Sequence, residues 1–160
     1  MKKPAYSAAL DRVLFRASRL ARELGGAQTG TEHLLLALSQ ERISQTGRIL
    51  CYQGAEGRLL RCMLLTKREQ PEPSGRQGFS GAAARALDGA RHEALRLGAP
   101  LCQPEHLLLS LMRDDAYAAA QVLSELGVDC NCVFSETYDR LRILHPAQDV
   151  KGQSELKLLE

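Results

Sequence analysis

The 160-residue chain contains no tryptophan, and aromatic residues make up only 4% of it. The core must therefore be built from aliphatic side chains, chiefly leucine and alanine, which are strong helix formers. This composition favours an all-α protein. The length fits one ordinary domain or two very small ones.

Long apolar runs are also missing. No stretch approaches the roughly 20 residues of a membrane-spanning helix, and the start MKKPAYSAAL lacks the continuous apolar segment of a signal peptide. We therefore expect a cytoplasmic chain without a membrane partner. The net charge of +2 arises from interspersed acidic and basic residues rather than a basic stripe, so nucleic acid is not an expected partner either.

Several chemical motifs are absent. There is no phosphate-binding Gly-x-x-x-x-Gly-Lys-[Ser/Thr] loop and no Gly-x-Ser-x-Gly nucleophile elbow. The five cysteines are odd in number, lack Cys-x-x-Cys spacing and do not cluster with the four histidines as zinc ligands would. We predict reduced structural thiols, no metal, no cofactor and no catalytic residue. A small all-α enzyme using Cys or His is the alternative. The duplication disfavours it, because the cysteines, Cys51, Cys62 and Cys102 among them, have no cysteine counterpart in the repeat described next.

The dominant feature that is present is an internal repeat. GTEHLLLAL at 30–38 returns as QPEHLLLSL at 103–111. An offset of 73 residues aligns 6–38 with 79–111 without a gap, and about fourteen of the 33 pairs are identical. Such self-similarity indicates a duplicated supersecondary unit that buries its apolar face against its copy.

Each unit is predicted to contain about four helices. In the first, apolar residues recur at three-and-four spacing from Leu10 to Leu24, with Ser7 placed to cap the start. Gly54 and Gly127 are predicted to end the third helix of each unit. The predicted organisation is an all-α, pseudo-twofold fold of about eight helices: repeat 1 at 4–68, a Pro- and Gly-rich linker at 69–78, repeat 2 at 79–144 and a tail at 145–160.

The Glu-His pair of each repeat invites a catalytic or metal interpretation. However, consecutive helical residues point about 100° apart, and helical metal sites prefer ligands three or four residues apart. We therefore predict that His33 and His106 turn inward as structural residues with one nitrogen hydrogen-bonded. Glu32 and Glu105 are expected at the surface of the first helical turn, where a carboxylate stabilises the helix dipole.

Ser7 and Ser80 have two interpretations. The hydroxyl can cap its own helix by accepting a backbone N–H. Alternatively, the same helix end offers unpaired N–H groups to an external anion. A carboxylate near such an anion site suits a ligand that carries a cation next to a phosphate.

These motifs together resemble a known family. The order [Tyr/Phe]-Ser, a helix ending in Leu-Gly, Thr/Pro-Glu-His-Leu-Leu-Leu and Val-Leu-x-x-Leu-Gly-Val-Asp resembles the double Clp repeat at the N-terminus of Clp unfoldases, over about 4–144. EALRLG and AAQVLSELGVD are most similar to the ClpC branch. The resemblance implies a non-catalytic bundle that recruits substrates and adaptors for an ATPase ring and its ClpP peptidase.

The resemblance also implies a ligand. ClpC-type domains of Gram-positive bacteria bind phosphorylated arginine in two equivalent sites, where a hydroxyl holds the phosphate and the Glu of Glu-His meets the guanidinium. The matching residues are Ser7 with Glu32 and Ser80 with Glu105. The implied partners are protein substrates, MecA- or McsB-like adaptors, and the ATPase modules and ClpP of a full assembly.

Two related interpretations stay open. A stand-alone Clp-repeat adaptor would never join a ring, and ClpB-type disaggregases also carry this double repeat. We interpret the end SELKLLE as the start of a connection to a first ATPase module.

Overall fold

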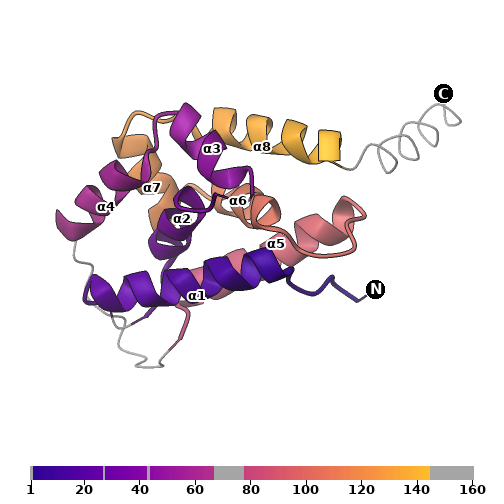
Figure 1. Ribbon diagram of the computed structural model, residues 1–160, viewed down its shortest axis with the longest axis horizontal. Coiled ribbons are helices and arrows are strands. Elements are labelled where there is room, and N and C mark those ends of the chain that lie inside the picture. Colours follow the sequence, from indigo (N-terminus) through magenta and orange to yellow (C-terminus); the bar gives the residue numbers. More distant parts are fainter. Residues whose placement is uncertain (1, 27, 43, 67–77, 145–160) are drawn as a thin grey trace, which may run out of the picture.

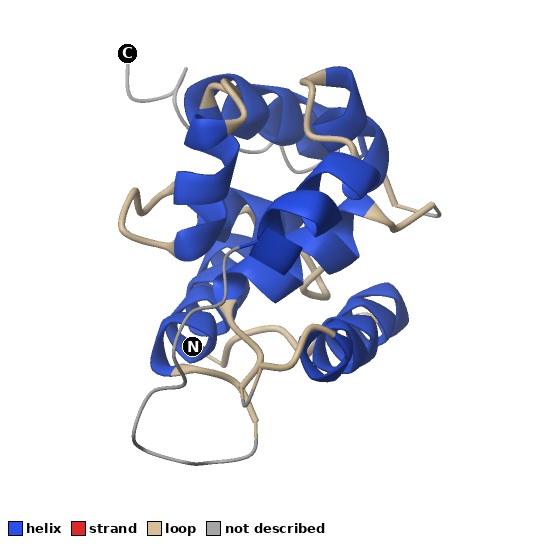
Figure 2. Ribbon diagram, turned by 90° about the vertical axis from the view of Figure 1, so that its left-hand side faces the viewer, coloured by secondary structure: helices blue, strands red, loops and turns tan. Residues whose placement is uncertain are grey.

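The computed structural model describes residues 2–26, 28–42, 44–66 and 78–144. All regular elements within these residues are helices (Figure 2), apart from two isolated β-bridges. The all-α prediction is therefore confirmed. The eight helices are α1 (Ala8–Glu23), α2 (Thr31–Ser39), α3 (Thr46–Tyr52), α4 (Gly57–Thr66), α5 (Gly81–Arg96), α6 (Pro104–Met112), α7 (Ala118–Glu125) and α8 (Cys130–Leu144).

The helices repeat with the sequence. α1 and α5 both have 16 residues, α2 and α6 both have 9, and each pair begins 73 residues apart. The third helices end at Gly54 and Gly127, whose φ values of 100° and 78° are left-handed, as predicted. The predicted linker, except for Gly78, and the tail at 145–160 lie outside the described residues.

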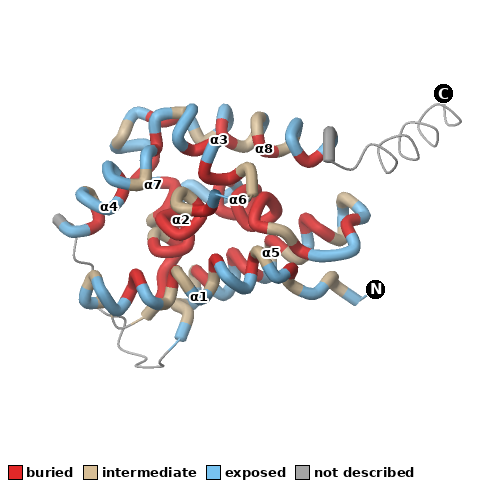
Figure 3. Tube along the Cα trace, viewed as in Figure 1, coloured by how far each residue is buried: buried red, intermediate tan, exposed pale blue. Residues whose placement is uncertain are grey.

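α2 and α6 form the centre of the fold. They lie between α1 and α5 on one side and the remaining helices on the other (Figure 1), and they are buried along nearly their whole length (Figure 3). Their leucine triplets explain this position, because such helices are apolar on every face. The core is mostly Leu and Ala, as the composition predicted.

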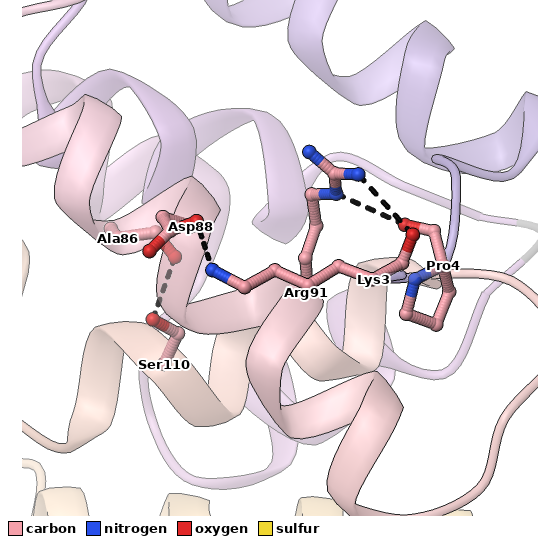
Figure 4. Close-up of polar contacts among 6 residues, drawn as sticks. All are labelled: Lys3, Pro4, Ala86, Asp88, Arg91 and Ser110. Atoms are coloured by element: carbon pink, nitrogen blue, oxygen red, sulfur yellow. Dashed lines mark hydrogen bonds and ion pairs between the residues drawn. The ribbon is translucent and has the colours of Figure 1, made fainter. Parts of the chain in front are cut away.

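The second repeat has small residues where α5 meets α6. The Ser110 hydroxyl donates to the Ala86 carbonyl at 2.7 Å (Figure 4), and a Cβ on Gly89 would lie 2.5 Å from Ser110 Oγ. The corresponding position on α1 is Arg16. The small side chains therefore let α5 approach α6 closely.

The N-terminal segment is anchored on α5, a helix of the other repeat. Lys3 Nζ lies 2.6 Å from Asp88 Oδ1, and the Arg91 guanidinium donates to the Pro4 carbonyl at 3.0 Å and the Lys3 carbonyl at 3.3 Å (Figure 4). Arg91 also lies over the Tyr6 ring, 5.7 Å from its centroid. These contacts fix the chain just before α1 begins.

Candidate functional site

The segments that lead into α1, α2, α5 and α6 pair across the two repeats. Ser7 N–H donates to the Cys102 carbonyl at 2.9 Å, three residues before Glu105. In the same way Ser80 N–H donates to the Thr29 carbonyl at 2.9 Å, three residues before Glu32. The start of α1 is thus beside the start of α6, and the start of α5 is beside the start of α2.

This pairing corrects one expectation. The family resemblance implied that Ser7 acts with Glu32 and Ser80 with Glu105, each pair within one repeat. However, Thr29 Oγ1 lies 3.5 Å from Ser18 Oγ in the middle of α1, and Ser18 is about 16 Å along the helix from Ser7. The structure therefore groups Ser80 with Glu32 and Ser7 with Glu105, because the two bridges join opposite repeats.

Both serines cap their helices. Ser7 Oγ accepts the Leu10 N–H at 3.1 Å, and Ser80 Oγ accepts the Ala83 N–H at 3.1 Å. Each hydroxyl satisfies one of the free donors at a helix start. The two serines differ in exposure, because Ser7 is buried whereas Ser80 is half-buried.

Both histidines turn inward, with exposed fractions of 7% for His33 and 0% for His106. His33 Nδ1 accepts the Gly30 N–H at 2.9 Å, and His106 Nδ1 accepts the Gln103 N–H at 2.8 Å. A nitrogen that accepts cannot carry the proton, so each neutral ring is protonated at Nε2. The imidazoles therefore cap the helix start from inside the core.

The Glu32 carboxylate folds back over the start of α2. A Cβ on Gly30 would overlap Glu32 Oε1, so the carboxylate occupies space that a larger residue would fill. Oε1 is 3.4 Å from His33 Nδ1, but that nitrogen already accepts a hydrogen bond, so the contact is not a charged pair. Burial raises the pKa of Glu32, partly offset by a hydrogen bond from its own backbone N–H.

Glu105 has a different environment from Glu32. It is only 4% exposed, and its Oε1 accepts the Gln45 N–H at 3.1 Å, at the start of α3. The expectation that both glutamates stay at the surface is therefore wrong for Glu105. The Glu32 side chain keeps 14% of its surface exposed.

The bond from Gln45 to Glu105 has a counterpart in the other repeat. Thr31 Oγ1 accepts the Ala119 N–H at 3.2 Å, at the start of α7. At the position of Thr31 the second repeat has Pro104, which has no hydroxyl, and Glu105 supplies the acceptor instead. Sequence reasoning missed Thr31 and Gln45. The available signal was the exchange of Thr-Glu for Pro-Glu between the repeats.

Burial decides the state of Cys102, whereas Cys51, Cys62 and Cys132 are exposed. Burial raises the pKa of the Cys102 thiol to about 12, so this thiol stays protonated and unreactive at neutral pH. In the part of the chain that the structure describes, no three His, Cys, Asp or Glu side chains are grouped to hold a metal ion. None of the described helices is long and apolar enough to cross a membrane.

The fold occurs in solved structures of N-terminal chaperone domains. The N-terminal domain of the caseinolytic protease associated chaperone ClpD from Arabidopsis thaliana superposes with a TM-score of 0.72 at 21% identity, covering 85% of this chain and 96% of that one. The Hsp104 N-terminal domain from Candida albicans gives 0.68 at 17% identity, covering 83% and 89%. Together these likenesses show that the chain shares the helical fold of those domains.

The family follows from the sequence. Residues 1–53 and 78–158 match the family described as "Clp repeat (R) N-terminal domain", and the chain belongs to that family. The chaperone protein ClpC1 of Oryza sativa chloroplasts is 33% identical over 122 residues, which are 75% of this chain and 13% of that protein. The Bacillus subtilis "Negative regulator of genetic competence ClpC/MecB" is 32% identical over 123 residues, 76% of this chain and 15% of that protein.

The chain thus spans only about 13–15% of the length of the curated relatives that it matches. What it shares with them is the N-terminal repeat domain. The paired helix starts and both Glu-His pairs lie within the matched residues, whereas α4 of the first repeat lies outside them.

Proposed function

We propose that this chain recruits protein substrates and adaptor proteins to a ClpC-type ATP-dependent unfoldase, and that it binds phosphorylated arginine on those proteins. The ligand residues would be Ser7, Glu32, Ser80 and Glu105, used in the cross-repeat groups Ser80 with Glu32 and Ser7 with Glu105. In the full assembly the partners would be ATPase modules, ClpP and MecA- or McsB-like adaptors.

The grouping of Ser80 with Glu32 is the observation that carries this proposal. Ser80 caps the start of the 16-residue helix α5 through the Ala83 N–H, and α5 has no acidic residue in its first turn. A helix start of this kind attracts a phosphate. Glu32 follows Thr29, which pairs directly with Ser80, so a guanidinium joined to that phosphate would meet a carboxylate with a charge-assisted hydrogen bond.

The two sites should differ in strength. α1 carries Asp11 in its first turn, which repels a phosphate bound near Ser7. The Glu105 carboxylate is already bonded to the Gln45 N–H and is almost fully buried. We therefore propose tighter phosphoarginine binding at Ser80 and Glu32 than at Ser7 and Glu105.

Calorimetry with a phosphoarginine peptide and its unphosphorylated twin tests this function. We expect only the modified peptide to bind, with one dominant site per chain. Glu32→Ala should remove that site while the helical circular dichroism signal is kept. Gly30→Ala should weaken it as well, because the new Cβ would displace the Glu32 carboxylate.

Glu105→Ala is the matched control, since it removes the same side chain from the other repeat. It should leave the dominant site in place. Absence of binding to the intact chain would contradict the phosphoarginine proposal and return both serines to helix capping. Two sites of equal affinity would contradict only the proposed difference between them.

A ClpB-type disaggregase N-domain is the second candidate. ClpB of Oceanobacillus iheyensis is 32% identical over 124 residues, as similar as the ClpC relatives. A stand-alone Clp-repeat adaptor is the third. Whether the native reading frame continues after Glu160 into ATPase modules distinguishes an unfoldase from a stand-alone adaptor. Binding of phosphoarginine would favour the ClpC type over the ClpB type.

A further inference from the structure

The duplication creates two corresponding grooves on the outer faces of α1 and α5. The groove on α1, which we call the α1 groove, has a volume of about 570 Å³ and continues to Arg61 of α4. The groove on α5, the α5 groove, has a volume of about 640 Å³. Most of their lining positions correspond at the 73-residue offset, including Arg12 with Arg85 and Arg19 with His92. A difference in charge between the two grooves therefore comes mainly from different side chains at corresponding positions of the repeats.

The α1 groove is basic. Its lining contains four arginines and two carboxylates, a formal charge of +2. The arginines are Arg12, Arg16, Arg19 and Arg61. A surface of this charge favours an acidic ligand.

The α5 groove has the opposite sign. Three carboxylates outnumber two arginines among its lining residues, so the formal charge is −1 with His92 neutral. These charges are also engaged internally. Glu93 accepts from Arg96 at 2.7 Å and from Arg113, and Asp88 pairs with Lys3 at 2.6 Å. The α5 groove therefore has little unsatisfied charge to offer a ligand.

Charges in the α1 groove are engaged more loosely. Arg19 and Arg61 lie 3.9 Å and 3.6 Å from the Glu23 carboxylate, and Arg16 lies 3.8 Å from Glu41. These separations are longer than hydrogen bonds. The exposed guanidinium groups of Arg19 and Arg61 can thus donate hydrogen bonds to an incoming carboxylate without first breaking short ones.

The α1 groove also presents an exposed aromatic side chain. Phe15 is 65% exposed, the largest exposed fraction among the large apolar side chains of α1, and its counterpart in the α5 groove is Asp88. An exposed ring between arginines provides an apolar contact within a cationic surface. Aromatic and Arg side chains together are typical of residues that dominate binding interfaces.

We propose that the α1 groove docks an acidic segment of a partner protein that carries a large apolar side chain, which packs on Phe15 while its carboxylates pair with Arg12 and Arg19. The α5 groove does not take this segment. The inference rests on the proposed recruiting function, but it uses none of the residues assigned to phosphoarginine.

Peptide display on the intact chain tests the proposal. Random 12-residue peptides are selected on the wild-type chain, and the recovered peptides are measured by fluorescence anisotropy. We expect sequences rich in Asp and Glu with a Phe, Trp or Leu. Their affinity should fall about tenfold or more in Arg12→Glu/Phe15→Asp/Arg19→Glu, and should also fall as salt rises.

The repeat supplies a matched control. Arg85→Glu/His92→Glu makes the corresponding changes in the α5 groove and should leave the affinity unchanged. All five altered side chains are exposed, so both variants should keep the helical circular dichroism signal. If the triple variant unfolds, the single variant Arg12→Glu replaces it in the binding measurement. Basic or uncharged peptides, equal binding to the triple variant, or recovery of no peptide above background would overturn the proposal.

Two further readouts separate this inference from the others. A chain that binds phosphoarginine peptide but no acidic peptide overturns the docking inference and leaves the proposed function standing. A chain that binds acidic peptide but no phosphoarginine peptide supports the docking inference and contradicts phosphoarginine binding. Concentration-dependent self-association that is lost in the triple variant would assign the α1 groove to a second copy of the chain and overturn docking of a partner.

Discussion

Glu32 and Glu105 occupy the same position of the two repeats, yet their carboxylates have different contacts. Glu105 accepts the backbone N–H of Gln45 from the other repeat, whereas Glu32 folds over its own helix start and keeps part of its surface exposed. The neighbouring residue explains this difference. Thr31 provides the cross-repeat acceptor in the first repeat, and Pro104 cannot do so in the second.

Loss of the Glu105 carboxylate should therefore destabilise the fold. Glu105→Ala leaves the Gln45 N–H without its acceptor, and we expect a loss of about 1–3 kcal/mol in the free energy of unfolding. Glu105→Gln keeps an oxygen that can accept and should lose less. Urea denaturation followed by circular dichroism measures both. Equal losses in the two variants would show that this hydrogen bond contributes nothing.

Glu32 should give the chain a distinct pH dependence. Burial raises its pKa above the ordinary value of 4.5, so the folded chain holds a proton at a pH where the unfolded chain has lost it. The contribution of Glu32 to stability therefore declines as pH rises above 4.5 through the folded pKa. Glu32→Gln cannot titrate, and its advantage over the wild type in melting temperature should grow from acidic to neutral pH.

A matched series with Glu105→Gln distinguishes this effect from general charge loss. A Glu32→Gln advantage that stays constant with pH would contradict the role of Glu32 titration. If the proposed ligand site is right, a phosphoarginine peptide should reduce the advantage, because a bound guanidinium stabilises the ionised carboxylate.

At the scale of elements, the contact between α5 and α6 is set by small residues. Ser110 donates to the α5 backbone at Ala86, and Gly89 leaves space for that hydroxyl. A glycine inside a helix costs about 0.5–1 kcal/mol relative to alanine. The close packing of the two helices offsets this cost.

Gly89→Ala should consequently destabilise the chain despite its better helix propensity. The new Cβ would lie 2.5 Å from Ser110 Oγ, and we expect a loss of about 1–3 kcal/mol from overpacking. Thermal denaturation measures the change. The double variant with Ser110→Ala should recover most of it, since the first repeat already has Ala37 at that position. Additive losses would contradict a direct clash.

For the whole molecule, the two repeats depend on each other. The starts of α1 and α5 pair with segments of the opposite repeat, and the caps of α3 and α7 come from residues of the opposite repeat. The central helices α2 and α6 bury almost every side chain, which neither repeat can do with its own helices alone. One repeat therefore lacks both the partner surface and several hydrogen-bond partners.

We predict that neither repeat folds cooperatively alone. A chain ending at Thr66 should show weak helicity and no cooperative thermal transition, and a chain starting at Gly78 should behave in the same way. Co-expression of the two pieces should restore a complex with the circular dichroism spectrum of the intact protein. A stable, cooperative melt of either piece would contradict this dependence.

The secondary structure was largely predictable from sequence. Apolar periodicity, the Ser7 and Ser80 caps and the glycines at 54 and 127 are local signals, and each appears where the structure has the corresponding helix end. The candidate site was predictable only as a set of residues. Periodicity indicates which face of a helix is buried but carries no information on which helix start lies beside it.

The sequence by itself determined the helices, the duplication and the inward orientation of His33 and His106, because these depend on neighbours within a turn or two of the chain. Only the tertiary structure decided that Ser80 lies with Glu32, that Glu105 is buried as a cap of α3, and that matched positions form a basic groove on α1 and an acidic one on α5. These features arise where the two repeats pack against each other or where separate helices line one surface. Such contacts join residues far apart in the chain.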